Sequence, residues 1–353
     1  MPYKIIQWAT GGIGQASIQG ITDHPELELV GCWVHSENKV GQDAGAIAGI
    51  AETGVLATNS IDEILALDAD CVVYSPVYPS EREVIALLES GKSVVTPTSW
   101  FYPFKTTEVD KLQAACIEGQ CVLHGTGIHP GGFTERLPLQ LTAMQHATRH
   151  VRSEEFSDIR TYGAPEVVGE MMMFGKTREE AETSPMGGFL AAGFYQSINM
   201  VADSLQLRVD ELSTRHEIGL AIAPIDSPIG VIEPGRVAAQ RFTWQGLCDG
   251  VPVVEAIVNW YMGEENFDQP WSFGAEGVRY EVEVKGDPDL LAVYHGCHPT
   301  TIEAGLERNA GIVVTAMHCV NSIPYICQAE PGIRTYLDLP LMSGRAAPQL
   351  LRI

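Results

Sequence analysis

The chain is poor in basic side chains. It has 22 Lys and Arg against 45 Asp and Glu, which gives its 353 residues a formal net charge of −23. Nucleic acids and anionic lipid surfaces are bound through clustered Lys and Arg. The composition therefore argues against a nucleic-acid or membrane partner and favours a small-molecule substrate. An anionic ligand would have to be held locally, by backbone amides or by a few well-placed cations.

Long apolar runs are also missing. No stretch of the sequence approaches the roughly 20 apolar residues that a membrane span needs. The first residues, MPYKII, lack the apolar region of a secretory signal. We therefore expect a cytoplasmic protein.

Paired cysteines are absent as well. None of the eight cysteines forms a Cys-x-x-Cys pair, and most lie in apolar runs such as DADCVVYS, which predicts buried, reduced thiols. The segments YHGCHPT (294–300) and MHCVN (317–321) bring His and Cys close together. Zinc sites use a second matching pair at short spacing, which this sequence lacks, so we expect no metal.

The order of expected elements predicts an α/β fold with two domains. Residues 1–134 alternate short strands and helices, which is typical of a Rossmann-type, doubly wound parallel sheet. Residues 135–299 predict an α+β domain with a mainly antiparallel sheet, including a half-exposed strand at HVRSEEFSDIRTY (150–162) and a hairpin at Asp249-Gly250. We expect residues 300–353 to pack back on the first domain through an apolar helix.

A glycine turn follows the first expected strand. Ala9, Gly11 and Gly14 form a G-x-G-x-x-G pattern with alanine at its first position, between a strand and a helix. In dinucleotide sites this turn lets a diphosphate approach the backbone amides at the helix start. A plain strand–turn–helix connection is the alternative. The predicted cofactor-binding residues of the turn are Ala9, Thr10, Gly11, Gly12, Ile13 and Gly14.

The second expected strand does not end in the acidic residue that usually binds the ribose of NAD. It ends in CWVHSENK, with His35 and Ser36 at that place and Lys39 close by, which favours the 2′-phosphate of NADP. Glu37 keeps NAD possible. Further cofactor contacts are expected at the ends of later strands and near the terminal helix, where Asn321 either contacts the nicotinamide amide or caps a bend. These further residues are Ser75, Pro76, Thr98 and Asn321.

Several longer segments resemble one family. They are ENKVGQDAG, GTGIHPGGFTERLPL, MFGKTREEA, AAQRFTWQGLCDGVPVV and HCVNSIPYICQAEPGIRT. With the glycine turn, they make the chain similar to the 2,4-diaminopentanoate dehydrogenase and native amine dehydrogenase family, whose first domain is related to dihydrodipicolinate reductase. The resemblance implies an NAD(P)-dependent oxidoreductase, usually a homodimer. Such enzymes reduce an imine formed from a ketone or aldehyde and ammonia, or run the reverse reaction on an amine.

One segment departs from that family. Members with amine chemistry resemble TCEELxYP where this chain reads TPTSWFYP (96–103), and the resemblance gives the family glutamate a role in proton handling. Thr98 and Ser99 stand where carboxylates would fall, and an unaided hydroxyl is no general base at neutral pH. Either another acid replaces the glutamate, or the protein does not build the imine itself.

Replacement acids are expected on the strand that contains Glu154, Glu155 and Asp158. Neighbours on a strand point to opposite faces, so only one of Glu154 and Glu155 faces a cleft; the alternative is a solvated acid. His129 follows a strand's carboxyl end and is either a proton shuttle or a hinge residue. Ser99, Tyr102 and Tyr195 are further hydroxyl candidates that equally suit packing. Aromatic residues that line a pocket or a core are Trp100, Phe101, Phe174, Phe194, Trp244 and Trp260.

Together these features predict an amine dehydrogenase-like oxidoreductase that prefers NADP and acts on a small, mostly apolar ketone, aldehyde or imine. Because the nicotinamide performs the redox step, loss of the family glutamate does not by itself remove reductase activity. A carbonyl reductase without ammonia chemistry and a non-catalytic NADPH-binding sensor are the alternatives.

Overall fold

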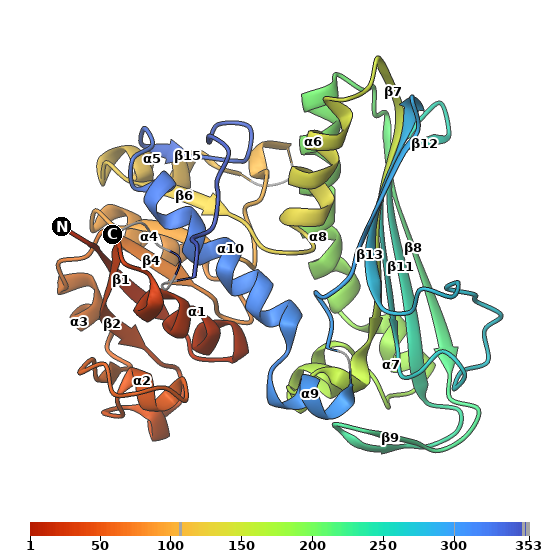
Figure 1. Cartoon of the computed structure of the whole chain (residues 1–353), viewed down its shortest axis with the longest axis horizontal. Coiled ribbons are helices and arrows are strands. Elements are labelled where there is room, and N and C mark those ends of the chain that lie inside the picture. The colour runs from red at the N-terminus through yellow and green to blue at the C-terminus, as the bar shows by residue number, and fades with distance from the viewer. Residues whose placement is uncertain (106–107, 300, 348–349, 351–353) are drawn as a thin grey trace. The chain divides into compact units, whose positions relative to one another are not determined.

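The chain divides into two compact units. The computed structural model describes residues 1–105, 108–299, 301–347 and 350. One unit comprises residues 1–131 and 312–353, and the other comprises residues 132–311 (Figure 1). None of the helices within the described residues combines the length and the apolar character needed to cross a bilayer.

The first unit is built on a seven-stranded sheet in which every neighbouring pair is parallel. This arrangement confirms the predicted Rossmann-type α/β class. In spatial order the strands are β15 (Gly332–Ile333), β6 (Val122–Gly125), β5 (Ser93–Thr96), β4 (Cys71–Tyr74), β1 (Tyr3–Trp8), β2 (Leu27–Trp33) and β3 (Ala57–Thr58).

Helices cover both faces of this sheet because consecutive strand residues point to opposite sides. Ile5 packs with Ile21 and Val320, whereas Ile6 packs with Leu87 and Leu112. The helices are α1 (Gly12–Asp23) and α10 (Ala310–Ile326) on one face, α4 (Glu81–Glu89) and α5 (Asp110–Glu118) on the other, with the shorter α2 (Ala44–Ile47) and α3 (Ile61–Ala66). The apolar terminal helix thus packs on the sheet of the first unit.

Two helix starts follow from local sequence. The Ser60 hydroxyl accepts the backbone N–H of Glu63 (3.3 Å), and the Ser80 hydroxyl accepts that of Glu83 (3.4 Å). Both serines are therefore N-caps.

The second unit is built on a six-stranded mixed sheet. In spatial order its strands are β14 (Leu290–Tyr294), β13 (Arg279–Asp287), β7 (Ala147–Asp158), β12 (Val251–Tyr261), β11 (Val237–Cys248) and β8 (Glu211–Leu220). The hairpin at Asp249-Gly250 is confirmed, since it joins antiparallel β11 and β12. The expectation of an antiparallel strand holds for β7 against β13, but β7 runs parallel to β12. The expectation of a half-exposed strand was wrong, since residues 153–157 are all buried. Burial on both faces explains the second difference, because β7 is a central strand and not an edge strand.

One face of this sheet carries helices (Figure 1). Phe133 stacks on Tyr280 of β13 with ring centroids 4.3 Å apart, and Phe194 stacks on Trp244 of β11 at 4.0 Å. These contacts hold the π-helical turn Gly132–Arg136 and α8 (Met186–Leu205) on that face, next to α6 (Leu137–Thr142). Further elements of the unit are a 3₁₀ turn (Ile159–Thr161), a second π-helical turn (Val167–Met171), α7 (Arg178–Thr183), α9 (Ile302–Glu307) and a small ribbon of β9 (Ile225–Ser227) and β10 (Gly230–Ile232).

Candidate functional site

The glycine turn at the end of β1 has a fixed backbone geometry. Ala9 has a φ of +70°, in the left-handed region that L-residues rarely adopt. The Gln7 amide supports the turn by donating to the Ala9 carbonyl (2.8 Å) and to the Ser75 hydroxyl (3.0 Å). A Cβ on Gly14 would lie 2.1 Å from the Ala9 carbonyl oxygen. Position 14 therefore tolerates no side chain, because the helix packs directly against the turn.

The space in front of the turn is open. Among the described residues, no atom lies within 4 Å of where a Cβ on Gly11 would be, and Gly11 and Gly12 are both exposed. The N-cap residue of the twelve-residue helix α1 is Gly11, which has no side chain to accept a hydrogen bond from the first backbone N–H groups of the helix. Open space before uncapped amides at a helix start fits a dinucleotide diphosphate.

A cation lies at the same turn. Lys39 ends the short 3₁₀ turn Glu37–Lys39, and its ammonium donates to the backbone carbonyl (3.0 Å) and the hydroxyl (3.1 Å) of Thr10. The structure thus brings together two predicted residues that lie 29 positions apart. His35 and Ser36 are exposed at the end of β2. A positive charge beside the turn suits a phosphate group.

Other predicted residues of the first unit follow the carboxyl ends of its strands. Ser75 comes after β4, and its backbone N–H donates to the Trp8 carbonyl (3.1 Å), with Pro76 partly buried beside it. Thr98 comes after β5 and pairs with the Thr96 hydroxyl (2.9 Å). In an open parallel sheet, ligands bind outside these ends.

The TPTSWFYP segment packs on the end of β6. A Cβ on Gly125 would lie 2.5 Å from the Ser99 carbonyl oxygen and 2.4 Å from the Trp100 carbonyl carbon. Tyr102 packs edge-on against Phe104 (5.2 Å), and His129 is partly buried in the segment after β6. The structure therefore brings this segment to the carboxyl edge of the sheet, without a carboxylate at positions 98 or 99.

Asn321 lies elsewhere in the first unit. Near the start of α10, Ile312 faces Gly12, and Met317 faces Gly20 further along α1. The two helices therefore run side by side in the same direction (Figure 1). Since α1 starts after the carboxyl end of β1, Asn321, which follows Met317 along α10, lies farther from that end. Asn321 is about 13 Å along the helix from Ile312 at 1.5 Å per residue. This position offers it no place beside the glycine turn.

In the second unit, Glu154 and Glu155 point to opposite faces of the sheet. Glu154 is 7% exposed and Glu155 is 8% exposed, so neither is the solvated strand acid that the sequence left as an alternative. Ser153 shows which face is which, because its hydroxyl donates to the Phe133 carbonyl (2.6 Å) on the helix-bearing side. Glu155 shares that side by alternation.

Glu155 belongs to a compact polar cluster. The Ser157 hydroxyl donates to Oε1 of Glu155 (2.5 Å) and lies 2.6 Å from Nε2 of His298. The Trp260 indole N–H donates to the same Oε1 (3.0 Å). The His298 ring lies face-on to Tyr280, with centroids 4.9 Å apart. We call these residues, Glu155, Ser157, Trp260, Tyr280 and His298, the Glu155 cluster.

Burial controls protonation in the Glu155 cluster. It lowers the pKa of His298, against the attraction of the Glu155 carboxylate, so the imidazole favours its neutral form. Burial and the Glu155 charge both raise the pKa of Tyr280 and of the neighbouring Tyr162. The two phenols therefore stay protonated at neutral pH, and the histidine and the carboxylate are the groups that can exchange a proton.

Glu154 belongs to an ion-pair network on the other face. It pairs with Arg152 and accepts the Asn259 amide N–H (2.9 Å), and Arg152 also lies 3.3 Å from Glu281. Burial raises the pKa of Glu154, while Arg152 opposes that shift. Asp158 likewise forms an ion pair, with Arg160 (2.5 Å). These contacts are those of structural carboxylates.

Most of the aromatic candidates are core residues. Trp100 lies in the apolar core of the first unit, and Phe101, Phe174, Phe194 and Trp244 are also buried. The Tyr195 hydroxyl pairs with Thr214 (2.6 Å). Trp260 differs because it offers its indole N–H to a buried carboxylate. Sequence reasoning did not bring Ser157 and His298 together; the only signal was the His-Cys-His run at 295–298, which was considered for metal.

The described residues include no group of three or more His, Cys, Asp or Glu side chains arranged to hold a metal ion. All eight cysteines are free, and five of them are buried, which confirms the prediction of buried thiols for those five: Cys32, Cys71, Cys116, Cys121 and Cys319.

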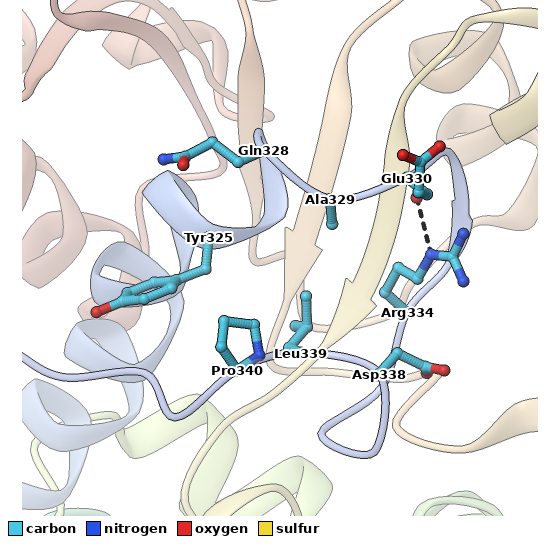
Figure 2. A pocket seen from close by; sticks show the side chains of 8 residues that line it. All are labelled: Tyr325, Gln328, Ala329, Glu330, Arg334, Asp338, Leu339 and Pro340. Carbon is cyan, nitrogen blue, oxygen red and sulfur yellow. Dashed lines mark hydrogen bonds between the residues drawn. The ribbon is translucent and has the colours of Figure 1, made fainter.

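A pocket of about 370 Å³ lies in the first unit, away from the glycine turn (Figure 2). It is formed where α10 ends and β15 begins, between Tyr325 and Leu339. Arg334 at its rim donates to the Glu330 carbonyl (2.8 Å). Since Gly332 pairs with Val122, the first residue of β6, this pocket lies at the amino edge of the sheet. It is not the site where parallel sheets bind a cofactor.

The fold and the turn define a dinucleotide-binding oxidoreductase with an added α+β unit. Comparisons with known proteins agree. The 2,4-diaminopentanoate dehydrogenase C-terminal domain matches residues 134–348, and the dihydrodipicolinate reductase N-terminal domain matches residues 5–123. The chain belongs to the 2,4-diaminopentanoate dehydrogenase family, an oxidoreductase family whose named members include an amine dehydrogenase.

Two relatives cover most of the chain. An amine dehydrogenase from Streptomyces virginiae is 29% identical over 95% of this chain and 96% of its own length. A 2,4-diaminopentanoate dehydrogenase from Acetoanaerobium sticklandii is 30% identical over 73% of this chain and 67% of its own length. Among solved structures, amine dehydrogenase from Mycobacterium smegmatis shares the fold, with a TM-score of 0.80, 22% identity and 98% coverage of both chains.

Proposed function

We propose that the protein is an NADPH-dependent reductase that forms an amine, either from a small, mostly apolar ketone or aldehyde together with ammonia or from a preformed imine. The observation that carries the cofactor half of this proposal is the open turn at Gly11, backed by uncapped helix amides and by the Gly14 contact with Ala9. A bound nicotinamide supplies the hydride. The residues of the turn bind and orient the diphosphate.

The preference for NADP rests on Lys39. Its ammonium lies against Thr10 in the glycine turn, and no acidic side chain replaces His35 or Ser36 at the end of β2. A lysine attracts a 2′-phosphate, whereas a carboxylate at this place would repel it.

The amine half of the proposal rests on family membership and on the Glu155 cluster. The 96–103 segment offers no carboxylate for imine formation, but the second unit holds a buried one beside a neutral histidine. A pure carbonyl reductase is the second candidate, and the Thr98-Ser99 pair is the observation that favours it.

Steady-state kinetics separates the candidates. Purified protein is mixed with NADPH and a panel of small ketones and aldehydes, with and without ammonium. The proposal expects NADPH oxidation that depends on ammonium, with an amine as product. Oxidation that is independent of ammonium identifies the carbonyl reductase, and NADPH binding without turnover of any carbonyl or preformed imine identifies a sensor.

A Gly11→Asp variant tests the turn itself. A carboxylate in the open space before α1 should weaken NADPH binding at least tenfold, because it meets the diphosphate with like charge. Gly188→Asp is the matched control, since Gly188 is also exposed and has open space at its Cβ, but lies at the start of α8. Equal NADPH affinity in both variants overturns the cofactor site.

A further inference from the structure

The hydrogen bonds of the Glu155 cluster fix where its protons lie. A carboxylate only accepts, so the single Ser157 hydroxyl proton is donated to Glu155 at 2.5 Å. The Ser157 oxygen must then accept from His298, whose Nε2 lies 2.6 Å away. A neutral His298 therefore carries its proton on Nε2 and presents a lone pair at Nδ1.

That lone pair has no partner within the described part of the chain. Nδ1 of His298 is buried, and no donor lies within hydrogen-bond distance of it. An unpaired buried acceptor costs about 1–3 kcal/mol, so native proteins rarely keep one without a bound ligand or water. The donor that satisfies it must bring an N–H or an O–H. In an enzyme that uses ammonia, ammonium or an amine nitrogen is such a donor.

We propose that His298, Ser157 and Glu155 form a proton relay that accepts a proton from ammonium at Nδ1 of His298. This inference rests on the proposed ammonia-dependent function. It assigns the proton handling that Thr98 and Ser99 cannot perform to three residues of the second unit.

The step balances without a redox partner. An N–H proton of ammonium passes to Nδ1, the Nε2 proton passes to Ser157 Oγ, and the Ser157 proton passes to Oε1 of Glu155. Ammonia, the other neutral histidine tautomer and a protonated Glu155 result. When the carbinolamine formed from ammonia and the carbonyl loses its hydroxyl group, the same path in reverse supplies the proton that leaves in water.

The surroundings hold the relay in place. Trp260 donates to the Glu155 oxygen that receives the proton (3.0 Å), which stabilises its ionised form before transfer. Tyr280 stacks on the imidazole and fixes the ring plane. The pKa values of Tyr280 and Tyr162 are raised, and the thiol pKa of the nearby Cys297 is raised by burial, so none of these groups competes for the proton.

The first test follows His298 by NMR in the full-length protein with histidine labelled by ¹⁵N, assigned with His298→Gln. The proposal expects the Nε2–H tautomer in the wild type and a lower His298 pKa in Glu155→Gln. Ammonium chloride should shift the Nδ1 resonance, whereas sodium chloride should not. An Nδ1–H tautomer, or an Nδ1 partner that is only water and does not respond to ammonium, overturns the relay.

The second test compares two serines of β7 on the same face. Ser157→Ala breaks the relay, and Ser153→Ala removes a hydroxyl that donates only to the Phe133 carbonyl. The measured quantity is the ratio of the ammonia-dependent rate to the rate on a preformed cyclic imine. This ratio should fall at least about 100-fold in Ser157→Ala, change less than threefold in Ser153→Ala, and recover in Ser157→Thr.

The two tests keep the proposals apart. Equal ratios in the two alanine variants overturn the relay even when the wild type is an active amine-forming enzyme. A wild type that turns over neither substrate overturns the proposed function, and the NMR result then decides on its own whether the three residues share protons.

Discussion

Glu154 and Glu155 are adjacent on β7 and nearly equally buried, and their side chains point to opposite faces of the same sheet. Glu154 meets Arg152 and Asn259, whereas Glu155 meets Ser157 and Trp260. The first carboxylate is surrounded by cationic and amide partners that neutralise it. The second is bonded to hydroxyl and indole donors and lies one serine away from a neutral histidine. Two identical side chains thus have different chemistry because the strand turns them in opposite directions.

The turn before α1 gives a stability prediction. Gly14→Ala should lower the free energy of unfolding by about 3 kcal/mol, because its Cβ would lie 2.1 Å from the Ala9 carbonyl oxygen and the backbone must shift. Gly11→Ala is the matched control, since its Cβ meets nothing within 4 Å and its φ of −71° suits any residue. Urea unfolding measures both. An equal loss of unfolding free energy in the two variants would contradict the close packing of α1 against the glycine turn.

Lys39 gives a prediction on cofactor choice. Lys39→Met should weaken NADPH binding about tenfold and NADH binding less than threefold, because only NADPH offers a 2′-phosphate to the ammonium. Lys4→Met removes an equal charge from a residue whose partner is Asp68 and should alter neither affinity. Fluorescence titration of both cofactors provides the measurement. A parallel loss for NADH and NADPH would mean that Lys39 only supports Thr10.

The network around Arg152 gives a prediction with a pH dependence. Arg152→Met leaves Glu154 without its ion-pair partner, while Glu281 and Glu283 keep Arg279 and Lys285, and should lower stability by about 2–3 kcal/mol at pH 8. The loss should shrink at pH 5, because burial already raises the pKa of Glu154 and lower pH neutralises the repelling carboxylates. Chemical unfolding at both pH values checks this.

Arg215 provides the comparison for Arg152. Its side chain is 71% exposed and pairs with Glu217 (2.8 Å), so Arg215→Met should change stability by less than about 0.5 kcal/mol at either pH. A loss for Arg152→Met that is no larger than this, or that grows towards pH 5, would contradict the interpretation that the half-buried Arg152 neutralises these carboxylates.

Because several thiols are buried, we expect the free energy of unfolding to fall at alkaline pH. Burial raises the pKa of Cys116 from 9.0 to about 11 and the pKa of Cys121 from 9.0 to about 12. Below pH 9 the thiols are protonated in both states and their contribution is complete. As pH rises from 9 towards the folded values, only the unfolded chain ionises, so stability is lost.

A Cys116→Ala variant measures that contribution. Between pH 8.5 and 10 the wild type should lose about 1 kcal/mol more stability than the variant, since one ionisation is removed. Cys248→Ser, at a partly exposed position, should lose as much stability between pH 8.5 and 10 as the wild type does. The comparison uses the difference in urea midpoints at each pH, and identical pH slopes for all three proteins would contradict it.

The strand–helix order of the first unit could be predicted because its signals are local. Short apolar runs, the caps at Ser60 and Ser80, and the spacing of Gly11 and Gly14 each depend on neighbouring residues alone. The direction and burial of β7 could not be predicted from the sequence, because the same alternation of polar and apolar residues is typical of a half-exposed strand. Its buried polar side chains are satisfied by partners more than a hundred positions away, such as Asn259 for Glu154 and Trp260 for Glu155.

The sequence by itself determined the class of the protein through its glycine turn. It also showed that carboxylates are missing at positions 98 and 99 and that the adjacent Glu154 and Glu155 point to opposite faces of one strand. Only the tertiary structure decided that Glu155 is the one on the helix-bearing face, that Lys39 reaches Thr10, and that Asn321 lies beyond Met317 along α10. The reason is physical: periodicity fixes that strand neighbours point apart, but the helices packed on one face decide which face is which. His298 joins Ser157 from 141 positions away, and no local pattern encodes that contact.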